Sequence, residues 1–294
     1  MRRRDIVVVG VGLATAFLLA TDLVPVVRGP ENWRWARRLL DVPLALLANL
    51  AVFAATALAV ARIRATWDRA PNRQRAPLLG AVVVLLFLQM VLLTAVEPRG
   101  LSLVPLRVRD TSFTSYHTVA RDVEDPVDFL RRYHRLQGRF PVHAPSQPPG
   151  RVLYFWAVDR AFGPERGPAA AGFLLMAIGA LAVVPLTGIV GGRRAPAAVG
   201  SALLLMACLP SFLLFTPETD HLILTLTLTA AAAALAALRR VGQPRALPLA
   251  FGAGLAGGLG LFVSWTVLPA LFAWGLVAAG SVLLTRAPGD ERPS

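Results

Sequence analysis

The sequence contains no lysine, a single cysteine and few charged residues, and each scarcity excludes a class of protein. The lone cysteine, Cys208, excludes an internal disulfide and a cysteine-ligated metal site. Charged residues make up 16% of the 294 residues and hydrophobic residues 55%, a balance too apolar for a soluble domain. We therefore expect an all-α polytopic membrane protein.

All 30 basic residues are arginines, and the formal net charge of the chain is +13. In a soluble protein such a charge would indicate nucleic-acid binding. In a membrane protein, the commoner cause is the enrichment of basic residues in cytoplasmic loops. The distribution of the arginines between the hydrophobic runs therefore decides between these explanations.

Hydrophobic runs predict about eight transmembrane helices, because a helix needs ~20 apolar residues to cross a bilayer. Six of them are residues 6–27, 42–61, 78–96, 168–191, 195–216 and 222–238, and the run 246–285 holds two more around a turn near Ser264-Trp265-Thr266. Residues 152–162 are too few to cross and include Asp159 and Arg160, so we interpret them as a juxtamembrane or re-entrant helix. No small-x-small cleavage site follows the first run, which indicates an uncleaved span.

This topology places both termini in the cytoplasm, and the charges support it. The inner segments hold 15 arginines and four acids, a net charge of +11, whereas the outer segments hold 15 arginines and 13 acids, a net charge of +2. The inner excess follows the positive-inside rule, so the charge requires no nucleic-acid partner. We expect a multi-pass protein of the plasma membrane, with Trp33 and Trp35 at the membrane interface of the first outer loop.

The chain divides naturally at residue 77. Residues 1–77 are expected to form a pair of spans and a cytoplasmic loop, and residues 78–294 a larger membrane module with a long outer loop, 97–151. The glycines in Gly252-x-Gly254 and Gly257-Gly258 follow no strand and have apolar flanks. They therefore predict close helix packing rather than a nucleotide-binding loop.

The outer loop 97–151 holds three of the four histidines and the densest mixture of acidic, basic and aromatic residues. Thr111 and Ser112 can cap a first amphipathic helix, and Asp125-Pro126 can start a second. The apolar positions are Tyr116, Val119, Ala120 and Val123 in the first helix and Val127, Leu130, Tyr133 and Leu136 in the second. We expect both helices to lie on a membrane face.

Polar residues near the outer ends of the spans are candidates for a site. They are His143 and Gln147 in the proline-rich segment that leads to a new helix near Arg151, and Glu218, Asp220 and His221 between two apolar runs. The first two are either solvated loop residues or ligands of a phosphate or a divalent ion. The other three form either a solvent-exposed turn or part of a site. The second interpretation is supported because three ionisable groups in four residues are costly at the end of an apolar helix.

Asp110 also has two interpretations. It can cap a helix, or it can act as a general base that accepts a proton from an attacking hydroxyl or amine. Arg109 beside it should keep the carboxylate ionised. Arg107, Arg109 and Arg121 can pair with a lipid phosphate or contact lipid headgroups.

Four short motifs resemble the GT-C superfamily of integral membrane glycosyltransferases, nearest in pattern to its protein mannosyltransferase and aminoarabinose transferase branches. They are Asp110 with Tyr116; Ser146-Gln147-Pro148-Pro149-Gly150 leading into Val152-Leu153-Tyr154-Phe155-Trp156; Ala161-Phe162-Gly163; and Pro217-Glu218-Thr219-Asp220. The resemblance extends over residues 78–285. Gln147 departs from it, because many relatives carry histidine there, although His143 lies four residues upstream.

The resemblance implies an inverting transfer of a sugar from a polyprenyl-phosphate donor to an acceptor at the extracytoplasmic face. Asp110 would be the acceptor-activating base. The substrate-binding residues would be Arg109, Tyr116, His143, Gln147, Glu218, Asp220 and His221. The donor phosphate would be bound directly or through a divalent cation, Mg²⁺ or Mn²⁺, held by His143 and Asp220.

A transporter or a non-catalytic membrane scaffold is the alternative. Transporters usually place ionisable residues at the middle of the membrane. Here the predicted spans contain almost none, with Asp22 near the end of its helix, and the polar residues gather in one outer loop. The pattern therefore favours the transferase.

Overall fold

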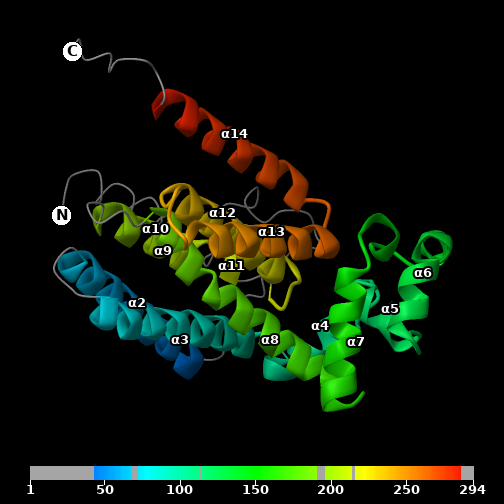
Figure 1. Ribbon diagram of the computed structural model, residues 1–294. Helices are drawn as coiled ribbons and strands as arrows, with labels where there is room; N and C mark the ends of the chain where they lie inside the picture. Colours follow the sequence, from blue (N-terminus) through cyan, green and yellow to red (C-terminus); the bar gives the residue numbers. More distant parts are fainter. Residues whose placement is uncertain are drawn as a thin grey trace, which may run out of the picture.

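The computed structural model describes residues 43–67, 72–97, 99–112, 114–190, 196–213 and 216–285, and the regular structure in these ranges is helical (Figure 1). The bundle consists of α2 (Pro43–Thr66), α3 (Asn72–Val96), α8 (Gly167–Leu181), α9 (Val183–Val190), α10 (Pro196–Cys208), α11 (Pro210–Leu213), α12 (Asp220–Leu238), α13 (Ala246–Val263) and α14 (Val267–Thr285). Shorter elements lie between α3 and α8: η4 (Gly100–Ser102), α4 (Leu103–Arg109), α5 (Tyr116–Arg121), α6 (Pro126–Leu136), η5 (Gln137–Arg139), η6 (Ala144–Ser146) and α7 (Gly150–Phe162). The predicted span 6–27, Trp33 and Trp35 lie outside the described residues.

Within the described residues, five helical segments are long and apolar enough to cross a membrane. They are Leu47–Thr66, Arg75–Val96, Gly167–Val190, Asp220–Leu238 and Ala246–Val263. The prediction of a helical, multi-pass membrane protein is thereby confirmed in its general form, whereas eight spans are not shown. The turn predicted at Ser264-Trp265-Thr266 is present between α13 and α14.

The structure corrects the predicted span 195–216. The described part of this range is divided into two helices. The first, α10, has 13 residues and ends at Cys208, and Pro210 begins the separate short helix α11. Proline lacks the amide donor and its ring clashes with the preceding turn, so a helix does not pass smoothly through it. At 1.5 Å per residue α10 rises ~20 Å, which is short of a ~30 Å hydrocarbon core.

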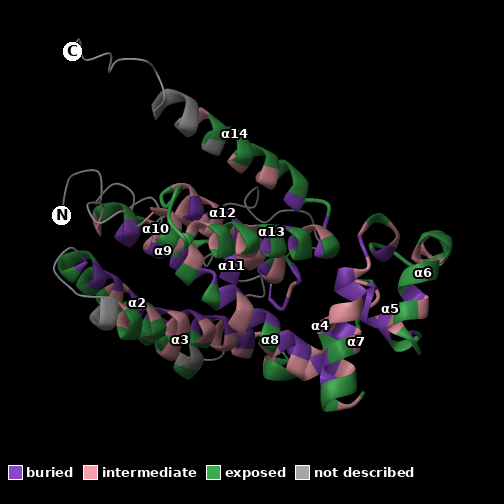
Figure 2. Cartoon of the chain, in the orientation of Figure 1, coloured by how far each residue is buried: buried purple, intermediate pink, exposed green. Residues whose placement is uncertain are grey.

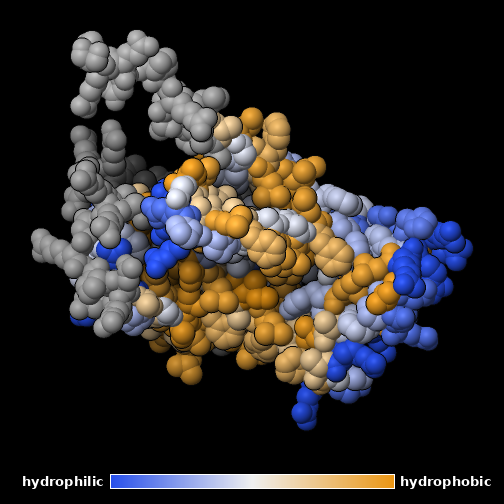
Figure 3. All heavy atoms as spheres, in the orientation of Figure 1, coloured by the Kyte–Doolittle hydropathy of each residue, from blue (hydrophilic) through white to orange (hydrophobic). Residues whose placement is uncertain are grey.

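The bundle buries apolar side chains between its helices and leaves others exposed on the outside (Figure 2). Large apolar residues on the surface of α13 and α14 include Leu247, Phe251 and Phe272, with exposed fractions of 78%, 71% and 67%. Figure 3 shows hydrophobic residues over the bundle and hydrophilic residues at the end that carries α4 to α7. An apolar exterior of this kind suits helices that face lipid.

Helices α4 to α7 gather at one end of the bundle, beside the first turn of α8 (Figure 1). In α6, the predicted start is confirmed: Pro126 is the first residue, and the Asp125 carboxylate accepts a hydrogen bond from the amide of Val127 at 2.8 Å. In α5, the prediction of a Thr111 or Ser112 cap is wrong. The cap position is Ser115, whose hydroxyl donates to the carbonyl of Pro141 instead of capping the helix.

The predicted apolar stripe of α6 is partly exposed. Val127 and Leu130 are 53% and 41% exposed, while Phe129 is buried. Phe129 makes ring contacts with Tyr133 and Phe140, and this aromatic group lies on the buried side of the helix. Aromatic rings bury more area than Val or Leu, so they determine which side faces inward.

Candidate functional site

Arg151 stands in the first turn of α7 and is only 8% exposed. Its Nε donates to the carbonyl of Val263 at 3.3 Å and its Nη1 to the Tyr116 hydroxyl at 3.1 Å. The guanidinium also lies over the Tyr116 ring, 5.0 Å from its centroid. A buried cation needs such partners, because removing a charge from water is costly.

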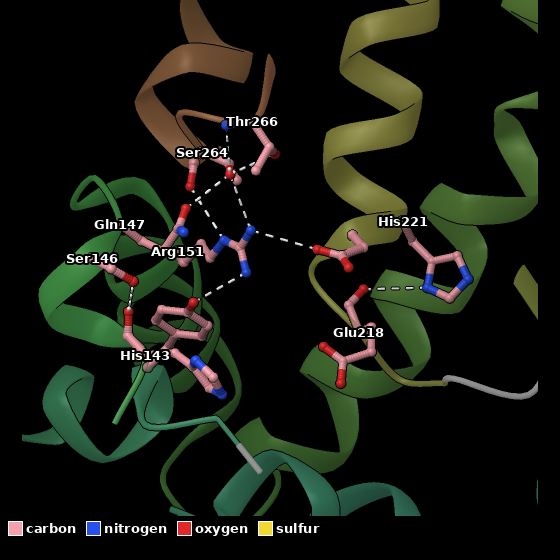
Figure 4. Close-up of polar contacts among 11 residues, drawn as sticks. His143, Ser146, Gln147, Arg151, Glu218, His221, Ser264 and Thr266 are labelled. Atoms are coloured by element: carbon pink, nitrogen blue, oxygen red, sulfur yellow. Dashed lines mark hydrogen bonds and ion pairs between the residues drawn. The ribbon is translucent and has the colours of Figure 1, made fainter. Parts of the chain in front are cut away.

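The other amino group of Arg151 reaches two further elements (Figure 4). Nη2 donates to the Ser264 hydroxyl at 3.2 Å and lies 3.5 Å from the Asp220 carboxylate. The Ser264 hydroxyl in turn donates to the side-chain oxygen of Gln147 at 2.8 Å. One arginine thus connects α5, α7, the start of α12 and the turn between α13 and α14. We call Arg151, Tyr116, Gln147, Asp220 and Ser264 the Arg151 cluster.

Close backbone packing positions this cluster. A Cβ added to Gly150 would lie 2.3 Å from the carbonyl oxygen of Phe262, so only glycine lets α7 approach the end of α13 so closely. This approach brings Arg151 against Val263 and Ser264. The same dependence on glycine recurs at Gly179 of α8, where an added Cβ would lie 2.4 Å from the His221 ring.

The charges in the cluster are unequally exposed. Asp220 is the carboxylate paired with Arg151 among the described residues, and its side chain is 77% exposed, against 9% for that of Arg151. An ion pair at 3.5 Å with a solvated carboxylate is weak, since water screens it. The guanidinium is therefore fixed in place, whereas its acidic partner can be exchanged.

Glu218 lies in the turn before α12, across from Arg151 and His143 in Figure 4. Its side chain projects from that turn toward the side of the view on which Arg151 and His143 lie. Burial, together with the neighbouring Asp220 carboxylate, raises the pKa of Glu218 to about 7. Arg151, Arg107 and the amide of Thr219 act in the opposite direction.

A second buried polar pair joins the same helices. Nε2 of His117, in α5, lies 3.0 Å from a carboxylate oxygen of Asp159, near the end of α7, and both side chains are largely buried. The other carboxylate oxygen packs against Gly167, where an added Cβ would lie 2.0 Å away. Burial lowers the pKa of His117, and the Asp159 carboxylate opposes this shift.

The structure brings only some of the predicted site residues together. Tyr116, Gln147 and Asp220 belong to the Arg151 cluster, and Glu218 lies beside it. His221 is buried, and its two ring nitrogens lie 2.9 Å and 3.2 Å from the carbonyls of Phe212 and Glu218. Its ring therefore stabilises the turn before α12. Glu218, Asp220 and His221 therefore form one folded unit.

The remaining predicted residues lie apart from these contacts. Asp110 is exposed at the end of α4, where its carboxylate accepts hydrogen bonds from the amide and hydroxyl of Ser112 at 2.9 Å and 2.6 Å. Arg109 points to the loop after α7, with Nη2 3.9 Å from the Glu165 carboxylate. His143 is exposed, and its carbonyl accepts from the Ser146 hydroxyl at 3.0 Å.

A metal centre finds no additional support. Within the described ranges, no group of three or more His, Cys, Asp and Glu side chains is arranged to hold a metal ion. The prediction of a cation between His143 and Asp220 consequently stays a prediction.

Sequence reasoning missed Arg151, Ser264, His117 and Asp159 as site residues. Arg151 had a visible signal, since it follows Pro-Pro-Gly and opens an otherwise apolar helix. A lone arginine there is buried or pairs with an anion. His117 also lay between apolar positions of the same predicted helix, whereas the role of Ser264 depends on a contact 117 residues away in the chain.

Comparison with known proteins identifies no relative: no family model, no curated protein and no solved structure matches the chain.

Proposed function

We propose that this protein is a membrane glycosyltransferase of the GT-C type that takes a sugar from a polyprenyl-phosphate donor at the end of the bundle formed by α4 to α7. The observation that carries the proposal is the buried guanidinium of Arg151, whose carboxylate partner is solvated. Guanidinium groups match the geometry of phosphate oxygens and bind them through charge-assisted hydrogen bonds.

The donor phosphate would take the position of Asp220 beside Arg151. Ser264 and Tyr116 already contact the guanidinium and hold it in one orientation. A preorganised cation can stabilise the negative charge that develops on the phosphate as the sugar leaves. The lipid chain of the donor would remain in the membrane beside the apolar helices.

Asp110 remains the acceptor-activating base implied by the resemblance. Its hydrogen bonds with Ser112 show that it also stabilises a local turn. The substitution Asp110→Asn separates these roles, because asparagine can keep most of the turn but cannot accept the proton. Loss of a general base lowers the rate by ~10²–10⁴-fold, whereas loss of a cap costs about 1 kcal/mol of stability.

Involvement of Mg²⁺ or Mn²⁺ is tested separately. If His143 and Asp220 hold a cation on the donor phosphate, a chelator abolishes transfer and the added metal restores it. Full activity in the chelator would leave direct binding by Arg151 as the mechanism.

The extracytoplasmic position of the site is supported by the balance of charges, because the arginines at the site end are interspersed with acidic residues. The opposite end of the bundle carries Arg62, Arg64, Arg75, Arg239, Arg240 and Arg245. Clustered basic residues are typical of a cytoplasmic end and support this orientation. In a Cys208→Ser background, an impermeant thiol reagent should label His143→Cys but not Arg240→Cys in intact cells. The reverse pattern would invert the topology, with both termini outside.

The direct test of function is a transfer assay with the purified protein and a panel of polyprenyl-phosphate sugars. We expect transfer by the wild type from at least one donor. Failure with every donor and acceptor class, by protein that is folded and monodisperse, would contradict the proposal and favour a non-catalytic scaffold.

A further inference from the structure

Two buried polar atoms at the end of the bundle opposite the Arg151 cluster have no acceptor among the described residues. They are the indole Nε1 of Trp67, which follows α2, and Nε of Arg75, near the start of α3. Trp67 is 5% exposed, and Cζ of Arg75 lies 4.8 Å from the centroid of its ring. Both atoms can only donate hydrogen bonds. Each therefore needs an acceptor that the described part of the chain does not supply.

The two helices hold these side chains against each other. The amide of Trp67 donates to the carbonyl of Ile63 at 2.8 Å, so Trp67 continues the last turn of α2. Helices α2 and α3 pack side by side (Figure 1), which places the start of α3 next to the end of α2. The Arg75 guanidinium then lies over the face of the indole ring, a favourable position for a cation.

Further positive charge lies close to this pair. Arg62 and Arg64 are exposed near the end of α2. Arg64 precedes Trp67 by three residues, a spacing that places two side chains on one face of a helix. Its side chain packs against α10, where a Cβ added to Gly200 would lie 3.0 Å from Cδ. Within the described ranges, no acidic side chain forms an ion pair with these arginines or with Arg75.

We propose that this end of the bundle binds the phosphate of an acidic phospholipid between Trp67 and Arg75. The inference does not depend on the glycosyltransferase function. The apolar segments Leu47–Thr66 and Arg75–Val96 end here, which is the depth of the lipid headgroups. Phosphate oxygens accept from both donors, and a guanidinium binds them through charge-assisted hydrogen bonds. Basic pockets between spans on the cytoplasmic side are typical sites for such headgroups.

The surroundings favour a lipid over a soluble phosphate. Leu58 lies nine residues before Trp67, ~13 Å along α2, and is 69% exposed. It offers apolar surface to an acyl chain whose headgroup lies at Trp67. Arg75 is only partly buried, so its side chain can rotate and admit a phosphate oxygen to the indole N–H. A lipid bound in this way would connect the end of α2 to the start of α3.

The test is a titration of the purified full-length protein with phosphatidylglycerol in a non-ionic detergent, with bound lipid measured by native mass spectrometry. Phosphatidylcholine, which has a phosphate but no net charge, should bind more weakly. We expect Arg75→Gln to weaken binding of phosphatidylglycerol by about tenfold or more, as for loss of a hydrogen bond to a charged group. Trp67→Phe keeps a ring but removes the N–H, so its effect should be smaller. Arg239→Gln, which changes an exposed arginine at the same end, should match the wild type.

Each outcome supports or overturns the inference. Weaker binding confined to Arg75→Gln and Trp67→Phe supports it, and melting temperatures without lipid show that both variants are folded. An equal loss in Arg239→Gln would assign the binding to overall charge, and unchanged binding by Arg75→Gln would place the lipid elsewhere. Displacement of the lipid by excess inorganic phosphate would assign the site to a soluble anion. Asp68 lies outside the described residues, and Asp68→Asn should bind the lipid at least as tightly as the wild type; weaker binding would contradict an anionic ligand.

Discussion

Adjacent residues of α5 take part in two buried polar contacts that differ in one respect. Tyr116 reaches Arg151 at the start of α7, and His117 reaches Asp159 near its end. Both contacts sit at the same junction of helices, and a carboxylate lies beside each: Asp220 pairs with Arg151, and Asp159 pairs with His117. The carboxylate side chain is 77% exposed beside Arg151 but only 15% exposed beside His117.

This difference separates a contact that can accept a ligand from one that holds helices together. Asp159 packs against the backbone at Gly167 and has little freedom to move. Asp220 can turn into water and leave the Arg151 guanidinium to another anion. Burial of the cation combined with exposure of its partner therefore marks the candidate site, and burial of both partners marks a structural joint.

The largest expected effect on activity comes from Arg151→Ala. It removes the cation that would face the donor phosphate under the proposed function, and it leaves the Tyr116 and Ser264 hydroxyls without that partner. We expect the rate of sugar transfer to fall by ~10²–10³-fold, as for loss of one preorganised electrostatic contact. Arg151→Lys keeps the charge but loses the planar fork, so it should restore only part of the rate. Equal activity of all three proteins would place the phosphate elsewhere.

His117→Ala should have the largest effect on stability. It leaves the Asp159 carboxylate buried without its partner, which typically costs about 3–5 kcal/mol. The double variant His117→Ala/Asp159→Asn removes the charge and should recover a large part of that loss. Thermal unfolding in detergent measures both. If the double variant is no more stable than His117→Ala, the cost arises from lost packing rather than from the unpaired charge.

Glu218 should make stability depend on pH. Its folded pKa of about 7 lies above the ordinary value of 4.5, so the folded state binds the proton more tightly than the unfolded state. Stability is therefore greatest below pH 4.5 as far as this group is concerned, and it falls as the pH rises toward 7, by about 3 kcal/mol at most. Glu218→Gln should flatten this part of the profile of melting temperature against pH. An unchanged slope would assign the dependence to other groups.

The smallest expected effect is that of Gly150→Ala. The new methyl group would meet the Phe262 carbonyl and separate α7 from α13, at a cost of about 1–3 kcal/mol. Gly252→Ala is the control, since nothing lies within 4 Å of the position that its Cβ would take. Both the melting temperature and donor binding should fall for Gly150→Ala alone. Similar behaviour of the two variants would show that the close approach is not required.

Much of the fold follows from local pattern. Apolar runs located five helical segments that are long and apolar enough to cross a membrane, and Asp125-Pro126 located the start of α6, because length, hydropathy and capping act over short distances. Pro210 also explains the break after α10, so that error came from giving hydropathy more weight than proline.

The site was harder to predict, because its contacts cross the chain. Gln147 and Ser264 are 117 residues apart, and Arg151 and Asp220 are 69 apart. The motifs located Tyr116, Gln147 and Asp220 individually, but no spacing shows that one arginine joins them. Whether a carboxylate is exposed, as for Asp220, or buried, as for Asp159, depends on tertiary packing that the local sequence does not encode.

The central claim is that Arg151 binds a phosphate in place of Asp220, and the binding of a short-chain polyprenyl phosphate to purified variants in a chelator tests it most directly. Asp220→Asn removes the competing carboxylate and should bind the lipid more tightly than the wild type, whereas Arg151→Ala should lose binding. Glu124→Gln, which changes an exposed carboxylate between α5 and α6, should match the wild type. Weaker binding by Asp220→Asn, or unchanged binding by Arg151→Ala, would contradict the account.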